Sequence, residues 1–202
     1  MSAACACDLH EAPRLIVVTG GPGAGKTALL EVAQNTFCRH VAVLPEAASI
    51  LWTGGFPRRD TISARCAAQR AIVRVQFELQ RIAIEDGHFS LIICDRGTLD
   101  GLAFWPREPA AYFEELGLVR ERELARYAAV IHLQPPSRTG GYTTTKLRPE
   151  SAEQAAAIDQ RITHAWTGHP RTFVIPSNSS FVAKMERGIE LLRAEIPACC
   201  RR

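Results

Sequence analysis

The stretch Gly20-Gly21-Pro22-Gly23-Ala24-Gly25-Lys26-Thr27 decides the fold. Its spacing, Gly followed by four residues and then Gly-Lys-Thr, is the pattern of a phosphate-binding loop, or P-loop. The apolar run over 15–18 predicts a buried strand before it, and residues 28–33 predict a helix after it. Because strand, glycine-rich turn and helix follow in this order, the sequence favours a P-loop over a turn with a surface lysine.

A P-loop holds the phosphates of a nucleotide with its backbone. Glycines let the chain fold around an anion, because a Cβ would clash there, and the helix N-terminus adds further N–H groups. We expect Lys26 to bring positive charge to the β- and γ-phosphates and the Thr27 hydroxyl to bind Mg²⁺. The predicted nucleotide contacts are Gly21, Pro22, Gly23, Ala24, Gly25, Lys26, Thr27 and Ala28.

The composition is that of an ordinary globular protein with one domain. The chain has 202 residues, of which 47% are hydrophobic and 22% are charged, so it can bury a sizeable core. A net charge of +3 gives no reason to expect a nucleic-acid partner. No apolar run reaches membrane-spanning length, and residues 1–7 lack the features of a secretory signal. We therefore expect a cytoplasmic protein without a membrane partner; the composition does not decide the oligomeric state.

The cysteines favour a reduced, intracellular protein, because their number is odd and their positions are scattered. They are Cys5, Cys7, Cys38, Cys66, Cys94, Cys199 and Cys200. Chain ends often lie close together, so the pairs at the two ends could meet and bind a metal ion, although their spacing matches no zinc pattern. The other interpretation is that these thiols lie on disordered tails.

Strand and helix patterns alternate along the chain. The predicted strands cover 14–19, 41–44, 91–94, 128–133 and 172–175. The predicted helical segments cover 26–36, 47–52, 61–86, parts of 98–127, 151–166 and 179–195. This alternation predicts an α/β fold of three layers, a P-loop NTPase fold with a five-stranded parallel sheet flanked by helices. The predicted domain covers 14–196, between a disordered leader at 1–13 and a tail at 197–202.

The long predicted helix over 61–86 carries two stripes at helical spacing. The apolar stripe consists of Ile72, Val75, Leu79 and Ile82. A neighbouring polar stripe consists of Gln69, Gln76 and Gln80. These amides could bind a small molecule or could form a solvated face, and the sequence leaves both interpretations open.

Charged residues follow the second and third predicted strands. Ligands bind where the carboxyl ends of parallel strands meet, so Glu46, Asp95 and Arg96 should share the cleft of the P-loop. Asp95 is a candidate Mg²⁺ ligand opposite Thr27, or else a helix N-cap. Arg96 suits a phosphate or an acceptor oxygen, or else pairs with a carboxylate. Glu46 is a candidate general base, with helix capping and metal support as alternatives.

The polar stretch at about 134–150 is long for a connection inside a compact domain, which indicates a lid or a mobile solvated loop. A closing lid would bring Arg138 or Arg148 to the transferring phosphoryl group, and Arg161 on the next helix is a third candidate. Asn178 follows the fifth predicted strand, where the adenine of a nucleotide could lie. We expect these side chains to complete the site.

Together these motifs resemble a known family. The resemblance rests on Val18 to Thr27, Leu44 to Ala48, Cys94 to Gly97, His169 to Ile175, Asn178 and Phe181. Over 14–196 the chain resembles the AAA-type P-loop ATPase and kinase domains related to the nicotinamide riboside kinase part of the bacterial NadR regulator. The resemblance implies a sheet of the nucleoside/nucleotide-kinase type and binding of ATP or GTP.

The chain is also similar, more distantly, to deoxynucleoside kinases. Their second strand ends in Pro-Glu, which matches Pro45-Glu46, and the similarity implies that Glu46 is a general base. Their acid-Arg motif matches Asp95-Arg96. The chain departs from their pattern at the next position, where it has Gly97 and they usually have Ser.

The leading hypothesis is an ATP- and Mg²⁺-dependent kinase that acts on the hydroxyl of a small molecule. The alternative is a slow NTPase that uses bound ATP or GTP as a switch for a protein partner. A kinase needs a base such as Glu46 beside its acceptor, and a switch does not. GTP stays open as the nucleotide, although the chain contains no Asn-Lys-x-Asp stretch of the kind that many GTPases use to bind guanine.

Overall fold

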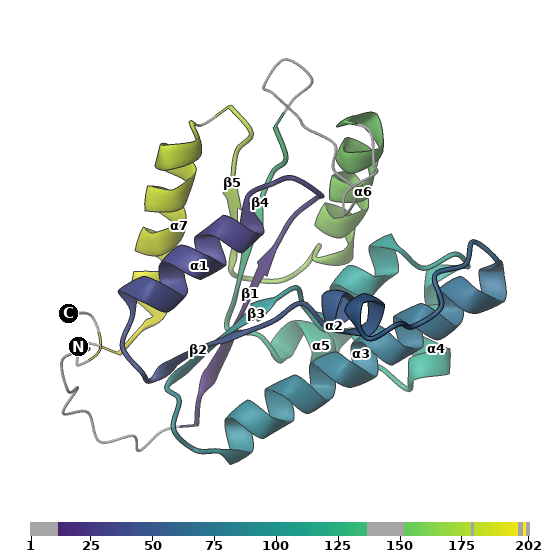
Figure 1. Cartoon of the computed structure of the whole chain (residues 1–202), viewed down its shortest axis with the longest axis horizontal. Helices are drawn as coiled ribbons and strands as arrows, with labels where there is room; N and C mark the ends of the chain where they lie inside the picture. The colour runs from purple at the N-terminus through teal and green to yellow at the C-terminus, as the bar shows by residue number, and fades with distance from the viewer. Residues whose placement is uncertain (1–11, 137–151, 179, 198–199, 201–202) are drawn as a thin grey trace.

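Five parallel strands form one sheet with the order β2-β3-β1-β4-β5 (Figure 1). The computed structural model describes residues 12–136, 152–178, 180–197 and 200. The strands are β1 Arg14–Thr19, β2 Val41–Leu44, β3 Leu91–Asp95, β4 Ala129–Leu133 and β5 Thr172–Ile175. The predicted α/β fold with a five-stranded parallel sheet is therefore confirmed.

Helices connect the strands and cover both faces of the sheet. They are α1 Lys26–Thr36, α2 Ala47–Thr53, α3 Ile62–Glu85, the 3-10 helix η1 Thr98–Ala103, α4 Pro109–Leu116, α5 Arg120–Ala125, α6 Ala152–Ala165 and α7 Phe181–Glu195. Within the described part of the chain, no helix is long and apolar enough to cross a membrane.

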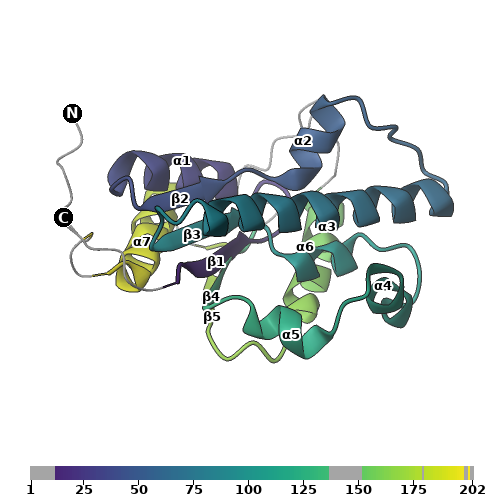
Figure 2. The ribbon, with the colours of Figure 1, turned by 90° about the horizontal axis from the view of Figure 1, so that it is seen from below.

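The sheet separates two apolar layers. Alternate residues of β1 point to opposite faces: Ile16 and Val18 pack with α1 and α7, and Leu15 and Val17 pack with η1 and α6. Figure 2 shows the two groups of helices on either side of the strands. Because both faces are covered, the strands are continuous apolar runs rather than alternating ones.

The strand register brings the carboxyl ends of the central strands together. Val18 of β1 pairs with Asp95 of β3, and Thr19 pairs with His132 of β4. Leu44, the last residue of β2, pairs with Cys94. The chain therefore leaves β1, β2 and β3 at the same edge, and this edge holds the P-loop.

The structure corrects one prediction about the long helix. The sequence pattern assigns Ile82 to the apolar stripe, which would pack against the core, but 55% of its surface is exposed, whereas Ile72 is buried. The three glutamines Gln69, Gln76 and Gln80 are buried instead, so they do not form a solvated face. A polar stripe can face the inside of the molecule here because two of these amides donate hydrogen bonds to buried oxygens.

Most of the predicted leader, tail and lid lies outside the described residues; the exceptions are 12–13, 134–136, 197 and 200. Arg138 and Arg148 belong to this part of the chain, as do Cys5, Cys7 and Cys199. Their roles stay predictions.

Candidate active site

The P-loop turns sharply where β1 ends. Gly20 has a φ of 133°, and a Cβ at this position would lie 1.9 Å from the carbonyl oxygen of Leu133. Only glycine fits such a conformation next to the backbone of β4. Gly25, with a φ of 98°, then forms the N-cap of α1, so the loop ends at a helix N-terminus as predicted.

Lys26, the first residue of α1, folds back over the loop. Its Nζ donates hydrogen bonds to the carbonyl oxygens of Gly20 at 2.9 Å and Gly21 at 3.0 Å. Burial, together with the nearby Arg96 guanidinium, lowers the pKa of Lys26 to about 7. A bound polyphosphate would supply the negative charge that this buried ammonium lacks.

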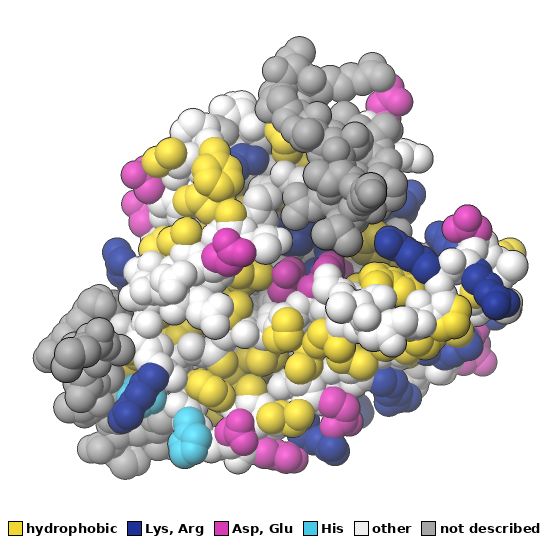
Figure 3. All heavy atoms as spheres, in the orientation of Figure 1, with side chains coloured by type: hydrophobic (Ala, Val, Ile, Leu, Met, Phe, Trp, Pro, Cys, Tyr) yellow, Lys and Arg dark blue, Asp and Glu magenta, His cyan; other side chains and the backbone are white. Residues whose placement is uncertain are grey.

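A cavity of about 610 Å³ opens beside the P-loop. It is lined by Pro22, Gly23, Ala24, Gly25, Lys26, Thr27, Glu46, Ala48, Ser49, Trp52, Thr53, Arg58, Gln69, Ile72, Gln76, Asp95, Arg96, Asp100, Gly101, Phe104 and Ile158. Figure 3 shows acidic side chains gathered in the middle of the face that this cavity opens onto. The structure thus brings most of the predicted site residues to one place.

Two predicted loop contacts lie outside the cavity lining. The backbone N–H of Gly21 donates to Asp159 Oδ1 at 2.7 Å, and the same oxygen lies 2.9 Å from His132 Nε2. Ala28 packs against the core between the sheet, α1 and α7. Asp159 on α6 was not predicted; it fixes the start of the P-loop from the side of β4.

Asp95 ends β3 directly beside β1. Its Oδ1 is buried and, among the described residues, has no hydrogen-bond partner. Burial raises the pKa of Asp95 to about 6, against the opposing effect of Lys26. The N-cap alternative fails because Gly97 caps η1 and its N–H is bound by Asp100 Oδ2 at 2.8 Å.

A carboxylate oxygen without a hydrogen-bond partner is the kind of ligand atom that a hard divalent cation prefers. Thr27, with its hydroxyl, lines the same cavity as Asp95 and is exposed. The two side chains therefore fit the predicted Mg²⁺ site.

Glu46 and Arg96 form an ion pair across the ends of β2 and β3. Arg96 Nε lies 2.7 Å from Glu46 Oε1, and Ser49 Oγ donates to Glu46 Oε2 at 2.6 Å. Burial by itself would raise the pKa of Glu46, but the Arg96 guanidinium, the Ser49 hydrogen bond and the Lys26 charge together outweigh it, and the net direction is down. Glu46 occupies the N-cap position of α2, yet its side chain makes no cap hydrogen bond. Its carboxylate instead faces the cavity.

Arg96 is held in an uncommon backbone conformation. Its φ is 71°, in the left-handed region that a non-glycine residue rarely adopts. The guanidinium donates to Gly20 O at 3.3 Å, lies 3.5 Å from Asp100 Oδ1 and stacks 5.5 Å from the centre of the Phe104 ring. These contacts fix the guanidinium between the P-loop and η1.

Asp100 is a site residue that the sequence interpretation missed. It is buried and accepts hydrogen bonds from the Thr19 hydroxyl, the Gly97 N–H and the Trp166 indole. An acid at the third position of a helix is one half of the capping-box signal, which could have revealed it. Asp100 connects β1, η1 and α6 at the floor of the cavity.

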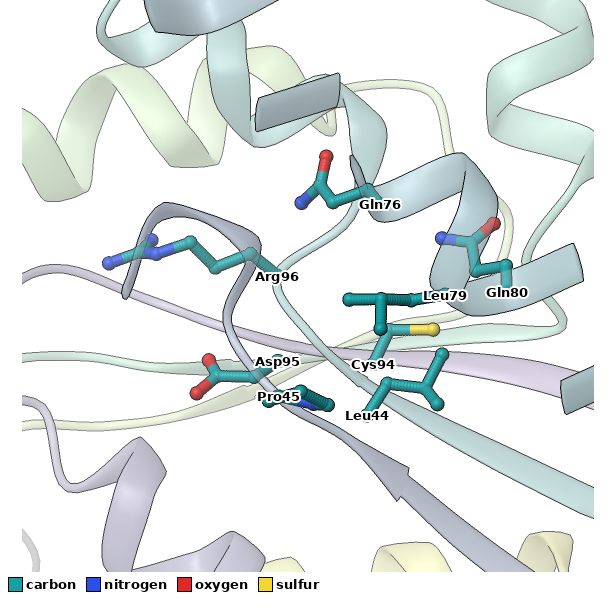
Figure 4. A pocket seen from close by; sticks show the side chains of 8 residues that line it. All are labelled: Leu44, Pro45, Gln76, Leu79, Gln80, Cys94, Asp95 and Arg96. Atoms are coloured by element: carbon teal, nitrogen blue, oxygen red, sulfur yellow. The ribbon is translucent and has the colours of Figure 1, made fainter. Parts of the chain in front are cut away.

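A second, smaller cavity of about 10 Å³ separates α3 from the ends of β2 and β3. Figure 4 shows that Asp95 and Cys94 point in opposite directions, as successive strand residues do, and that Gln76 and Gln80 approach from α3. Gln76 Nε2 donates to Gly97 O at 3.4 Å, and Gln80 Nε2 donates to Tyr127 Oη at 3.0 Å. Gln80 is therefore structural, while Gln76 and Gln69 also line the large cavity.

Aromatic and polar side chains from α2, α3, η1 and the residues next to them form one wall of the large cavity. The Arg58 guanidinium lies 5.2 Å from the centre of the Trp52 ring, and both residues line the cavity with Phe104 and Gln69. The sequence interpretation missed Trp52 and Phe104. A signal was available, because Trp52 lies six residues after Glu46 in a predicted helical turn.

Two other predicted residues lie elsewhere. Arg161 donates from Nε to the carbonyl oxygen of Ala103 at 2.8 Å, which ties α6 to η1. Asn178 is exposed after β5 and does not line the cavity. A contact between Asn178 and adenine stays a prediction.

The fold and this site define a P-loop nucleotide-binding domain of the nucleoside/nucleotide-kinase-like type. The chain belongs to the AAA domain family, whose model matches residues 15–183. No curated protein matches the chain in sequence. The finer likeness to nicotinamide riboside kinase stays a prediction.

Solved structures with the same fold include two kinases. The deoxyadenosine kinase from M. mycoides with bound dATP is 14% identical, with a TM-score of 0.60 over 89% of this chain and 98% of that one. Thymidylate kinase from Candida albicans is 13% identical, with a TM-score of 0.61 over 91% of this chain and 92% of that one. At sequence identities this low, the structural similarity establishes the shared fold alone.

Proposed function

We propose that the protein transfers the γ-phosphoryl group of ATP to the hydroxyl of a small molecule, with Mg²⁺ as cofactor. The observation that carries this proposal is the Glu46–Arg96 pair, which lines the same cavity of about 610 Å³ as the P-loop. The cavity is lined by aromatic and polar side chains well beyond the P-loop itself. A protein that only bound and hydrolysed a nucleotide would have no use for this additional wall.

The P-loop side of the cavity binds the donor. In this proposal, the backbone of 22–27 and the Lys26 ammonium hold the phosphates, where negative charge is spread over the transferring group. Thr27 and Asp95 hold Mg²⁺, which when bound neutralises charge on the β- and γ-phosphates. Each of these roles uses a group that already faces the cavity.

The ends of β2 and β3, which also line the cavity, activate and orient the acceptor. Because Arg96 lowers its pKa, Glu46 is ionised at neutral pH and can accept the proton of an attacking hydroxyl. Arg96 keeps this carboxylate in position and has further contacts to Gly20 O and Asp100. The proposal assigns Glu46 as general base and Arg96 as the group that positions it.

The acceptor in this proposal is nucleoside-like. Trp52 and Phe104 offer flat faces for a ring, and Gln69 and Gln76 offer amides for its polar edge. The shared fold with a deoxyadenosine kinase and a thymidylate kinase supports the same class of acceptor.

The test is a screen of nucleosides, nucleotides and other hydroxylated metabolites with γ-labelled ATP and, in parallel, γ-labelled GTP. We expect label to move to at least one nucleoside-like acceptor, and the transfer to require Mg²⁺. Label that appears only in inorganic phosphate, at a slow rate, would instead support a nucleotide switch.

A further inference from the structure

Two cysteines and a histidine meet at the edge of the sheet opposite the active site. His40 Nδ1 lies 4.0 Å from Cys38 Sγ and 3.8 Å from Cys200 Sγ, and the three ligand atoms all lie within 4.8 Å of one another. Cys38 and His40 precede β2, and Cys200 follows α7. Figures 1 and 2 both show the end of α7 beside the α1–β2 connection.

The spacing of these atoms is close to that of a tetrahedral metal centre. With Zn–S of about 2.3 Å and Zn–N of about 2.0 Å, neighbouring sulfur and nitrogen ligands lie about 3.5 Å apart and two sulfurs lie about 3.8 Å apart. The observed separations differ from these values by less than the distance that a ligand atom moves when a side-chain torsion rotates. The site would need no rearrangement of the backbone.

The backbone already holds the ligand pair in a tight turn. The N–H of Val41 donates to Cys38 O at 3.0 Å, which fixes the Cys-x-His turn. The carbonyl of His40 accepts from the N–H of Ser90 at 2.8 Å, at the start of β3. The side chain of His40 is also buried. Two of the three ligands are therefore pre-positioned by the sheet itself.

Cys200 reaches the same place from the other end of the chain. Its N–H donates to Pro197 O at 2.9 Å, and its side chain is buried against the core that α1 and α7 share. Cys38 packs against the same core, and both residues carry thiols rather than disulfide sulfurs. A metal ion here would join residues 160 positions apart in the sequence.

We propose that Cys38, His40 and Cys200 bind a thiophilic divalent cation, Zn²⁺ above all, which fastens the C-terminal end of the chain to the α1–β2 turn. Two thiols would each release a proton on binding, and the imidazole would bind neutral through Nδ1, so the two thiolates balance the charge of the ion. Water or a ligand from elsewhere takes the fourth position. This site is independent of the proposed kinase activity.

The sequence leaves two interpretations of the terminal cysteines open, a metal site that pairs Cys5 and Cys7 with Cys199 and Cys200, or thiols on tails. Neither includes residues in the α1–β2 turn, and Cys5, Cys7 and Cys199 lie outside the described residues. The structure places Cys200 beside Cys38 and His40 instead. Sequence spacing gave no signal for this group, because its members come from two distant segments.

The test uses Co²⁺ as a spectroscopic probe of the full-length, freshly reduced chain. We expect about one Co²⁺ per chain with thiolate-to-cobalt charge transfer and intense visible bands, both displaced by Zn²⁺. An ion bound by oxygen ligands at Thr27 and Asp95 would not give these bands. The melting temperature should fall when the Zn²⁺-loaded protein is treated with a chelator.

Three alanine variants locate the site. Cys38→Ala and Cys200→Ala should each weaken Co²⁺ binding by at least about tenfold and remove charge-transfer intensity. Cys66→Ala removes a buried thiol from α3 and is the matched control, which should keep the wild-type spectrum. Wild-type protein without thiolate bands at saturating Co²⁺ would overturn the proposal, and so would bands that persist unchanged in folded Cys38→Ala.

Discussion

Of the six described charged side chains that line the cavity, four have ionisation states that depend on one another. Lys26 and Arg96 supply the positive charges, and Glu46 and Asp95 supply the negative ones. Burial makes each charge costly by itself: it raises the pKa of Asp95, whereas the neighbours of Glu46 together outweigh burial and lower its pKa. The carboxylate beside Arg96 suits a base, and the Asp95 carboxyl, whose Oδ1 has no hydrogen-bond partner in the described part of the chain, suits a metal ligand.

Because the pKa of Lys26 is lowered, we expect the protein to take up a proton when a nucleotide binds. With a pKa of about 7, its amine is mostly neutral at pH 8 in the nucleotide-free protein, and the phosphates should raise this pKa and draw in close to one proton. Calorimetry of MgATP binding at pH 8 in two buffers of different ionisation enthalpy measures the uptake. Lys26→Arg, which stays charged, should show none; equal uptake in that variant would assign the proton elsewhere.

Asp95→Asn should weaken Mg²⁺ binding. The same substitution should stabilise the folded protein above pH 6. The folded-state pKa of Asp95 is raised, so ionisation destabilises the folded state as pH rises from about 4 to about 6, and the amide avoids that cost, about 1–3 kcal/mol. Melting curves at pH 4 and 7.5, with Asp86→Asn as the exposed control, measure the difference. A variant with normal Mg²⁺ dependence would exclude Asp95 as a ligand.

Glu46→Gln should slow phosphoryl transfer by about 10²–10⁴-fold and leave ATP affinity nearly unchanged, because the base acts on the acceptor rather than on the nucleotide. Phosphorus NMR follows the transfer and calorimetry gives the affinity, once the screen has supplied an acceptor. Ser49→Ala is the control, since it removes a hydrogen bond to Glu46 and keeps the carboxylate. Wild-type transfer rates in Glu46→Gln would refute the assignment of the base.

At the scale of elements, Trp166, the residue that follows α6, restricts the β3–η1 turn to glycine at position 97. A Cβ on Gly97 would lie 2.6 Å from the Trp166 ring and 2.7 Å from Val17 Cγ2. The turn therefore has no room for the Ser that deoxynucleoside kinases usually carry at this position. The departure reflects the packing of Trp166 just beyond α6, and it leaves Asp95 and Arg96 in their expected places.

Gly97→Ala should consequently destabilise the protein by about 1–3 kcal/mol, the usual effect of an added methyl group in a packed interior. Trp166→Phe removes the ring atoms nearest to position 97, so the double variant should lose less stability than the sum of the two single variants. Denaturant unfolding of the four proteins gives the coupling. Strict additivity would show that Trp166 is not what excludes a side chain here.

At the scale of the whole molecule, the sheet separates two sites at opposite ends of its strands. Glu46 and Asp95 lie where β2 and β3 end, and Cys38 and His40 lie just before β2 begins. Apolar layers on both faces of β1 to β4 fill the space between them.

Nucleotide binding should stabilise the entire domain. A ligand at about 100 times its Kd that binds only the folded state adds about 2.7 kcal/mol, so MgATP should raise Tm clearly. Lys26→Ala, which loses a donor to the phosphates, should show a much smaller increase under the same conditions. Scanning calorimetry with and without MgATP measures both, and an equal increase in the two proteins would contradict the role of Lys26.

Local sequence by itself determined the P-loop and the order of the strands and helices along the chain. It also placed Glu46 and Asp95 at the carboxyl ends of their strands. These features follow from short-range rules: glycine spacing, apolar runs and the edge at which parallel strands end. The same rules predict that Lys26 contacts phosphates and that Thr27 binds Mg²⁺.

Only the tertiary structure decided which groups face one another. Asp100, Trp52 and Phe104 join the site because η1 and α2 fold over it, and Cys200 meets Cys38 through the packing of α7 on α1. The buried face of α3 was predicted wrongly at Ile82, because hydrogen-bond partners on neighbouring elements let glutamines occupy the inside. Local sequence patterns do not indicate such hydrogen-bond partners, because the partners lie tens of residues away in the chain.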